Sequence, residues 1–270
     1  MDITEFRKQP HLSASGISDY LDCSLMYKFG RVDKIAPEVK SDALKFGSAI
    51  HKALSDFHQE KMIGNKLPIH DLHQLFENYW KAGTEGRSNI QYKEGKDFET
   101  LLLEGKELLS TYYQKVPDDG FKVLALEEPF AFHLNNLPVP IIGFIDLIEE
   151  DESGTIIIVD FKTSSKAYSI DDVDKSFQLL IYQMATKSNG YRDREILLRF
   201  DCLIKTKVPK FEQYYTTRGE MDERRAAKKI LKVWEGISKG VFIPNDGHWK
   251  CNGCSYRKHC DEWFAKETHD

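Results

Sequence analysis

An apolar run that ends in charged residues constrains this chain most. In GTIIIVDFKT, residues 154–163, the apolar β-branched run Ile156 to Val159 is followed by Asp160, Phe161 and Lys162. Such a run is typical of a buried strand. Since residues i and i+2 share one face of a strand, Asp160 and Lys162 point the same way and Phe161 points to the other face. The run predicts a core strand that presents an acid and a base at its end.

Length and composition are those of an ordinary globular protein. The chain has 270 residues, of which 41% are hydrophobic and 30% charged, enough for a sizeable core. Its apolar runs are far shorter than the ~20 residues of a membrane helix. The N-terminus, MDITEFRKQPHL, lacks the apolar centre of a signal peptide. A cytoplasmic location is expected, and in that reducing compartment the five cysteines are better interpreted as thiols or metal ligands than as disulfides.

Charge is unevenly distributed along the chain, whose net charge is −5. Residues 1–160 contain 17 Lys and Arg against 27 Asp and Glu, whereas residues 161–270 contain 21 against 16. A basic half beside an acidic half suits a nucleic-acid groove next to a carboxylate-rich site. A solvated charged surface has the same asymmetry, and charge alone favours that simpler interpretation.

The hydrophobic pattern changes from a helical period to a period of two near Pro117 and Gly120. Helices are predicted before this point over 16–30, 43–59 and most of 70–115. Three successive strands are predicted after it, over 121–134, 138–150 and 154–163. Their short turns imply antiparallel pairing. A helix over about 171–187, two strands within 194–206 and 211–217, and a charged helix over 219–239 complete the pattern. This order predicts an α/β core with an N-terminal helical region.

A second carboxylate, Asp146 in GFIDLI, lies among apolar residues of the preceding strand. A buried carboxylate needs a cation or a metal, and the short turn lets Asp146 and Asp160 meet at one site. Two carboxylates suit Mg²⁺ or Mn²⁺. Lys162 would then orient or help deprotonate a metal-bound water and offset charge on a phosphate. This predicts a phosphodiesterase centre; the alternative is a buried Asp–Lys ion pair, the commoner outcome for an isolated D-x-K.

Further polar residues could complete such a site. His51 lies beside the apolar stripe of its predicted helix and is a core histidine or a metal ligand. Glu127 and Glu128 alternate across a strand, so one of them at most reaches the site. Gln178 and Tyr182 share a helix face at i, i+4. They are either a surface pair or a hydrogen-bonded pair that holds a phosphate or the lysine.

The C-terminal segment CNGCSYRKHC spaces Cys251, Cys254 and Cys260 as C-x₂-C-x₅-C. The C-x₂-C pair indicates a metal site in a cytoplasmic chain. Candidates for the fourth ligand are Cys23, Cys202, His248 and His259. Spacing alone favours structural zinc, with an iron–sulfur cluster as the alternative. Either would fasten the tail to the rest of the fold.

Taken in order, these segments resemble the RecB-like branch of the PD-(D/E)XK nuclease superfamily. The resemblance is closest to its iron–sulfur members: CRISPR-associated RecB-like exonucleases, the AddB nuclease domain and phage exonucleases. Six motifs carry it along nearly the whole chain: SASGISDYLDC, FGSAIHKAL, LEEPF, GFID, VDFKT and QLLIY. Each motif is weak by itself, and the six in this order are specific.

The resemblance implies a restriction-endonuclease-like α/β fold, with a central mixed sheet flanked by helices and an iron–sulfur tail. It implies one nuclease domain over 1–270, made of a helical region (1–118), a sheet core (119–218) and a helix with the cysteine-rich tail (219–270). It also implies that Mg²⁺ or Mn²⁺ is bound by His51, Asp146, Asp160 and the backbone carbonyl of Phe161. Lys162 would be the catalytic lysine, and Glu127, Gln178 and Tyr182 would complete the catalytic site.

For the cysteines, the resemblance implies a [4Fe–4S] cluster and reverses the preference for zinc. Its four ligands would be Cys23, Cys251, Cys254 and Cys260, and Cys202 is left out. The family usually has Pro after the first cysteine, where this chain has Ser24.

The function that the resemblance implies is that of a metal-dependent DNA exonuclease on single-stranded or unwound ends, in a bacterial or phage-infected cell. Its roles would be replication, recombination, repair or CRISPR adaptation, with partner proteins and a homo-oligomer as options. The chain has no G-x₄-G-K-[ST] loop, so no helicase motor is expected. The alternatives are a non-catalytic DNA-end-binding module and an RNA-directed nuclease. Phosphate contacts are expected from Lys205, Lys207, Arg224, Arg225, Lys228 and Lys229.

Overall fold

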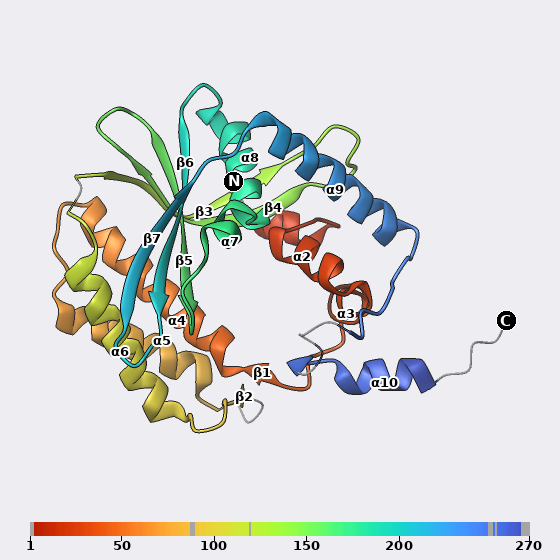
Figure 1. The fold of residues 1–270 in the computed structure, drawn as a ribbon, viewed down its shortest axis with the longest axis horizontal. Coiled ribbons are helices and arrows are strands. Elements are labelled where there is room, and N and C mark those ends of the chain that lie inside the picture. The colour runs from red at the N-terminus through yellow and green to blue at the C-terminus, as the bar shows by residue number, and fades with distance from the viewer. Residues whose placement is uncertain (1–2, 87–89, 119, 248–250, 252, 266–270) are drawn as a thin grey trace.

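The computed structural model describes residues 3–86, 90–118, 120–247, 251 and 253–265. Its centre is a five-stranded mixed sheet in the spatial order β3-β4-β5-β6-β7 (Figure 1). The strands are β3 (Lys122–Phe132), β4 (Ile141–Glu150), β5 (Ile156–Ser164), β6 (Ile196–Ile204) and β7 (Lys210–Thr216). Only the β5–β6 pair is parallel, and the other three pairs are antiparallel. The predicted antiparallel meander and the mixed sheet are both confirmed.

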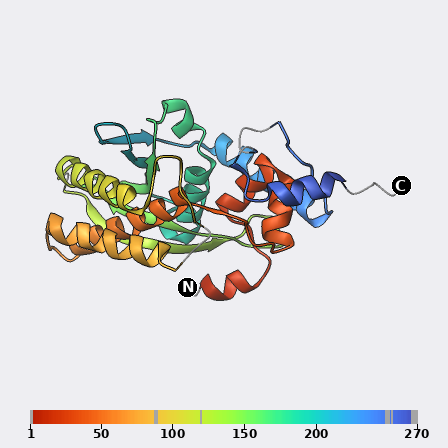
Figure 2. The same cartoon turned by 90° about the horizontal axis from the view of Figure 1, so that it is seen from below.

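Helices cover both faces of the sheet. On one face lie α4 (Asp42–Met62), α5 (Ile69–Thr84) and α6 (Phe98–Lys115), and on the other α2 (Ala14–Asp22), α8 (Phe177–Thr186) and α9 (Glu220–Ser238). The shorter elements are α1 (Ile3–Lys8), α3 (Ser24–Tyr27), α7 (Ile170–Asp174), α10 (Arg257–Ala265), the π-helical turns η1 (Lys28–Val32) and η2 (Lys187–Tyr191), and the parallel pair β1 (Lys40–Ser41) and β2 (Ile90–Gln91). The predicted fold class, a sheet flanked by helices, is therefore confirmed (Figure 2).

Two helices are shorter than the sequence pattern predicts. The helix predicted over 16–30 is interrupted at Cys23, whose backbone is extended (φ −161°, ψ 103°) between α2 and α3. The helix predicted over 171–187 is two helices, α7 and α8. Ser169 and Ser176 each cap one of them, since their hydroxyls accept hydrogen bonds from backbone N–H groups of the first turn. Such side-chain caps favour a new helix start over a continuous helix.

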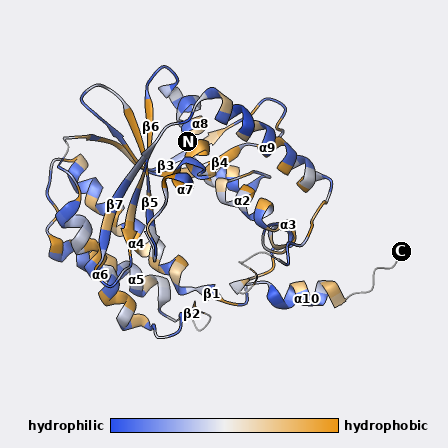
Figure 3. Ribbon diagram, in the orientation of Figure 1, coloured by the Kyte–Doolittle hydropathy of each residue, from blue (hydrophilic) through white to orange (hydrophobic). Residues whose placement is uncertain are grey.

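The strands divide the core into two layers. Along β5, Ile156 and Ile158 pack in the layer under α8, whereas Ile157, Val159 and Phe161 pack in the layer under α4. This alternation puts Asp160 and Lys162 on the α8 side, as the period-two pattern predicts. Figure 3 shows the hydrophobic residues along the strands and the hydrophilic residues along the outer side of α9. No helix among the described residues is long and apolar enough to cross a membrane.

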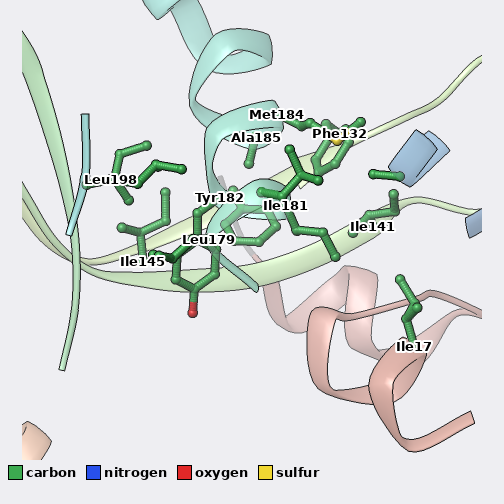
Figure 4. Packing of buried hydrophobic residues seen from close by; sticks show 14 of the residues in the cluster. Ile17, Phe132, Ile141, Ile145, Leu179, Ile181, Tyr182, Met184, Ala185 and Leu198 are labelled. Carbon is green, nitrogen blue, oxygen red and sulfur yellow. The ribbon is translucent and has the colours of Figure 1, made fainter. Parts of the chain in front are cut away.

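Helix α8 is the central helix of its layer. Every residue from Leu179 to Thr186 is buried, which suits a helix that is enclosed on all sides. Figure 4 shows Leu179, Ile181 and Tyr182 of α8 beside the sheet residues Ile145 and Leu198. The helix thereby packs against β4, which carries Asp146, and against β6, the neighbour of the strand that carries Asp160.

Candidate active site and cysteine cavity

The sheet opens between β4 and β5 at the predicted acidic residues. The antiparallel pairing of these strands ends at the Leu147–Val159 pair. Asp146 and Asp160 are the next residues on the two strands, so they face the opening. The ladder is replaced there by a side-chain contact, in which the Phe161 backbone N–H donates to Asp146 Oδ2 at 2.9 Å. The opening brings both carboxylates to one place, as the sequence predicts.

A chain of polar contacts runs from β5 to α8. Lys162 forms an ion pair with Asp160, and its ammonium donates to Gln178 Oε1 at 2.8 Å. The Gln178 amide in turn donates to the Tyr182 hydroxyl at 2.7 Å. Asp160 and Tyr182 are buried. Of the two interpretations of the Gln178–Tyr182 pair, the structure therefore shows the one in which it holds the lysine.

His51 and Glu127 reach the same opening from other elements. His51 of α4 places Nδ1 3.3 Å from Asp146 Oδ2, and its ring packs edge-on against Phe161. Glu127 of β3 has φ +45°, a left-handed conformation that side chains other than glycine rarely adopt. A cavity of about 630 Å³ adjoins these groups, and its lining residues are Ser48, His51, Lys52, Ser55, Asp56, Tyr79, Glu127 and Asp146.

The carboxyl groups at the opening place more negative charge there than the neighbouring Lys162 offsets. Burial raises the pKa of Asp160 to about 6, a rise that Lys162 opposes and the negative charge of Asp146 supports. Burial also raises the pKa of Glu127, and Asp146 raises it further. Burial lowers the pKa of His51, but the hydrogen bond and charge of Asp146 outweigh it, and the net pKa is raised. A bound cation would relieve this excess of negative charge.

The donor set fits a hard divalent cation. Carboxylate oxygens of Asp146, Asp160 and Glu127, with the His51 imidazole, are the kinds of ligand that Mg²⁺ and Mn²⁺ accept. Asp160 Oδ2 is buried and has no hydrogen-bond donor among the described residues, although the Lys162 ammonium lies beside it. As the side chains stand in the described part of the chain, no three of His, Cys, Asp or Glu converge tightly enough to enclose a metal ion. The carboxylates are held instead by Lys162 and the Phe161 amide.

The four predicted cluster cysteines line one cavity. Cys23, from the break between α2 and α3, meets Cys251, Cys254 and Cys260 around a space of about 220 Å³. Burial raises the pKa values of Cys254 and Cys260, and the nearby Cys23 raises both further. Cys202 lies instead fully buried in β6. His259 packs against Phe29, with Nδ1 3.5 Å from Glu38, and His248 lies outside the described residues.

Backbone contacts hold the C-terminal segment against α2 and α3. The Ser24 hydroxyl donates to the Ile243 carbonyl at 3.0 Å and accepts from the Ile243 N–H at 2.5 Å. The Tyr20 hydroxyl donates to the Val241 carbonyl at 2.7 Å. Ser24 occupies the position where the resemblance expects Pro, and its hydroxyl forms hydrogen bonds with both the N–H and the carbonyl of Ile243. The position of α10 in Figures 1 and 2 follows from other contacts, since Phe29 packs against the rings of Tyr256 and His259.

The basic residues predicted to contact phosphate differ in their surroundings. Arg224 and Arg225 are exposed on α9 and pair with acidic residues one turn away on the same helix. Lys207 and Lys228 are exposed, and Lys229 lies over the Phe177 ring. Lys205 is half-buried next to the end of β5. Only Lys205 of this set adjoins the strand that carries Asp160 and Lys162.

One buried charge network escaped the sequence pattern. Arg199 of β6 is 2% exposed and pairs with Glu149 and Asp201, both fully buried. The network lies on the α4 side, near His58. The signal that could have found it is the spacing of Arg199 and Asp201 in LLRFDCLI, where i and i+2 share a face among apolar residues.

The sheet opens to present two carboxylates and a lysine on neighbouring strands, an arrangement suited to metal-assisted hydrolysis. A model of the PD-(D/E)XK nuclease superfamily matches residues 11–261 of this chain. The match spans most of the sequence, so the protein belongs to the PD-(D/E)XK nuclease superfamily, in its RecB-like branch.

Relatives include a phage protein and part of a bacterial helicase–nuclease. The Gene 69 protein of Mycobacterium phage D29 is 24% identical over 272 residues, covering 94% of this chain and 97% of the phage protein. A subunit of the ATP-dependent helicase/deoxyribonuclease of Clostridium acetobutylicum is 24% identical over 209 residues. That match covers 68% of this chain and only 18% of the bacterial protein.

A solved structure shares the fold. The crystal structure of a candidate exonuclease from Eubacterium rectale superposes with a TM-score of 0.59 at 14% identity, over 94% of this chain and 91% of that one. The agreement extends over both the helical region and the sheet.

Proposed function

We propose that this nuclease is a metal-dependent DNA exonuclease that acts on single-stranded or unwound ends. The observation that carries the proposal is the opening between β4 and β5, where Asp146 and Asp160 lie together with Lys162 and His51. The similarity to part of a helicase/deoxyribonuclease supports DNA as the substrate. The open cavity beside His51 offers room for a strand.

In this proposal, His51, Asp146, Asp160 and the Phe161 carbonyl hold Mg²⁺ or Mn²⁺, with Glu127 at the edge of the site. The metal, when bound, supplies Lewis-acid activation of water and of the phosphate. The Lys162 ammonium faces the same opening and offsets negative charge that develops on the phosphate oxygens. Gln178 positions Lys162 through its carbonyl oxygen, and Tyr182 orients the Gln178 amide.

The cysteine cavity supports a [4Fe–4S] cluster as the second cofactor. Thiolates are the ligands of both zinc and iron–sulfur clusters. A single zinc ion draws four sulfurs to ~2.3 Å from one point, whereas a four-iron cluster holds its thiolates further apart. The four thiols line one cavity, and the resemblance to the iron–sulfur members of the family favours the cluster over zinc. Iron and acid-labile sulfide in anaerobically purified protein would support it, and stoichiometric zinc without iron would reject it.

The whole chain is proposed to act as one nuclease unit in the cytoplasm of a bacterial or phage-infected cell. The superfamily match over 11–261 includes the helical region, the sheet core and the tail, and the phage relative suits this setting. Replication, recombination, repair or CRISPR adaptation are the expected processes, with partner proteins and self-association as open options.

The test is digestion of end-labelled single-stranded DNA with Mg²⁺ or Mn²⁺. Asp160→Asn keeps the size of the side chain and removes the charge that metal and Lys162 require. It should abolish cleavage while leaving the fold intact by circular dichroism. Cleavage at the wild-type rate by this variant would overturn the assignment.

Two substrate controls separate the alternatives. A covalently closed circular single strand has no end, so an exonuclease leaves it intact and an endonuclease cuts it. An RNA of the same sequence tests the RNA-directed alternative. Tight binding of DNA ends without cleavage by any metal would favour the non-catalytic module.

A further inference from the structure

A second polar cavity lies beyond the active site along β5. It has a volume of about 430 Å³ and lies between the first turns of α4 and the end of β6. Three lysines and three hydroxyl side chains line it: Lys93, Lys96, Lys205, Thr163, Ser164 and Ser165. The three hydroxyl residues directly follow Lys162 in the chain. The cavity therefore lies at the C-terminal end of β5, the strand that carries Asp160 and Lys162.

Lys205 is the unusual residue of this cavity. Its ammonium lies 4.6 Å from the centre of the Phe46 ring. Among the described residues, neither a hydrogen bond nor an ion pair joins that ammonium to a protein acceptor. Burial lowers the pKa of Lys205, and the positive charges of Lys93 and Lys96 lower it further against the opposing effect of Glu104 and Asp42. A half-buried cation without an anionic partner is costly unless a ligand supplies the anion.

The two acids of the cavity are already engaged. Glu104 forms an ion pair with Lys96. Asp42 accepts from the backbone N–H of Ala43 at 2.6 Å and of Lys93 at 3.0 Å. Three lysines therefore face two carboxylates in this lining, which leaves one net positive charge together with the hydroxyl donors. This chemistry selects an anion and disfavours a metal ion.

Helix α4 and strand β5 link this cavity to the active site. On α4, Phe46 adjoins the cavity and His51 adjoins the carboxylates, about 8 Å further along the helix axis. Between them, α4 approaches β5 closely, since a Cβ on Gly47 would lie 3.3 Å from Thr163 Oγ1. The lysine cavity and the cavity beside His51 therefore lie a short distance apart along the same helix.

We propose that this cavity binds a phosphate of the substrate strand, with Lys205 as the principal contact and the Thr163 and Ser165 hydroxyls as further donors. The inference rests on the proposed function, because it assumes a nucleic-acid strand in the neighbouring site. Lysine acts here as a point charge for a tetrahedral anion. An internal phosphodiester, a terminal phosphate and free phosphate share this chemistry.

The test measures binding of a fluorescent single-stranded oligonucleotide by anisotropy, without divalent metal, across a range of salt. Lys205→Gln should weaken binding at low salt on the order of tenfold. It should also reduce the slope of log K against log salt by about 0.7, the share of one phosphate on a single strand. Lys205→Arg keeps the charge and should restore most of the slope. Lys210→Gln, an exposed lysine on the same hairpin, should match wild type.

To identify which phosphate binds, the loss of affinity in Lys205→Gln is compared for oligonucleotides with and without terminal phosphates. An equal loss on both identifies an internal phosphodiester, and a loss confined to the phosphorylated oligonucleotide identifies a terminal phosphate; both support the proposal. A wild-type slope in Lys205→Gln, or the same change in Lys210→Gln, overturns it. So does a cavity that binds inorganic phosphate while the slope with DNA is unchanged.

The outcome is separable from that of the proposed function. Binding without metal requires no cleavage, so a Lys205-dependent slope in a protein that never cuts DNA would refute the exonuclease and leave the phosphate site standing. Cleavage that depends on Asp160, together with a wild-type salt slope in Lys205→Gln, would support the exonuclease and refute the phosphate site.

Discussion

The long side chain of Lys162 is held in one position by its neighbours. Its ammonium has three fixed neighbours: the Asp160 carboxylate, Gln178 Oε1 and the Phe200 ring, whose centre is 5.0 Å away. A lysine side chain loses considerable rotamer entropy when it is fixed. Gln178 is therefore a positioning residue, and its own orientation is set by the Tyr182 hydroxyl.

Gln178→Leu should lower the cleavage rate about 10- to 100-fold, as is typical when a supporting contact is lost. The Michaelis constant for DNA should change less, because the partners of Gln178 in the structure are Lys162 and Tyr182. Tyr182→Phe leaves the Lys162–Gln178 contact in place and should have the smaller effect. Steady-state kinetics on a short oligonucleotide would check this order, and a larger defect in Tyr182→Phe would contradict it.

At the scale of elements, the edge of the active site carries backbone strain. Glu127 adopts φ +45° in the middle of β3, opposite the point where β4 and β5 separate. A side chain in the left-handed region costs roughly 1–2 kcal/mol. Strain of this kind is retained where surrounding structure and function require it. The position of the Glu127 carboxylate at the cavity is consistent with such a requirement.

Glu127→Gly and Glu127→Ala both remove the carboxylate, but only glycine relieves the strained backbone. The free energy of unfolding should therefore be about 1 kcal/mol higher for the glycine variant than for the alanine variant. Both should cut DNA more slowly than wild type. Urea denaturation of the pair measures the difference. Equal stabilities would show that the conformation of residue 127 is not strained.

Helix α4, which carries His51, is anchored by a buried histidine two turns further on. The His58 ring bonds through Nε2 to the Tyr112 hydroxyl at 2.6 Å and packs against Phe161. Burial lowers the pKa of His58 to about 3, with the positive charges of Lys61 and Arg199 as smaller causes. The folded protein thus keeps this imidazole neutral.

Acid should weaken the fold through His58. The unfolded chain takes up the proton near the ordinary pKa of about 6.5, whereas the folded chain does not until about pH 3. Stability should therefore fall as pH drops between these values, by up to about 1.4 kcal/mol per pH unit from this group. His58→Gln should show a shallower fall in urea denaturation from pH 7 to 4. His70→Gln, at an exposed position, should keep the wild-type slope.

At the scale of the whole molecule, the two ends of the chain meet at the cysteine cavity. Cys23 comes from the N-terminal helices, and the other three thiols come from the segment after α9. Ser24 and Tyr20 hold that segment through its backbone. A cofactor in this cavity would cross-link regions far apart in sequence, and its loss would leave the segment held by the Tyr20 and Ser24 contacts.

The proposed cluster predicts that Cys23→Ser binds less iron and melts at a lower temperature, since a cofactor bound only by the folded state stabilises it. Cys202→Ser is the matched control, because Cys202 is a buried thiol in β6 away from the cavity. It should keep its iron while losing some stability through a buried hydroxyl. Iron content and thermal unfolding measure both. Full iron in Cys23→Ser would exclude Cys23 as a ligand.

The local hydrophobic pattern of the sequence was sufficient to predict much of the fold. The alternation in 154–163 predicted which face of β5 carries Asp160 and Lys162, because strand geometry has a fixed period. The breaks at Cys23 and Ser176 were missed, because the helix pattern continues through both. The Ser176 hydroxyl caps a new helix, and Cys23 interrupts its helix with an extended backbone. The Arg199 network was missed because its partner Glu149 comes from a strand that is distant in sequence.

The sequence by itself determined the strands, most of the helices, their order, the superfamily and the acidic, basic and thiol groups that the site residues offer. These follow from side-chain periodicity and from residue types at fixed spacing. Only the tertiary structure decided that the sheet opens at Asp146 and Asp160, that Gln178 holds Lys162, and that Lys205 lacks an anion. Such contacts join residues far apart along the chain, and their geometry depends on how the helices pack on the sheet.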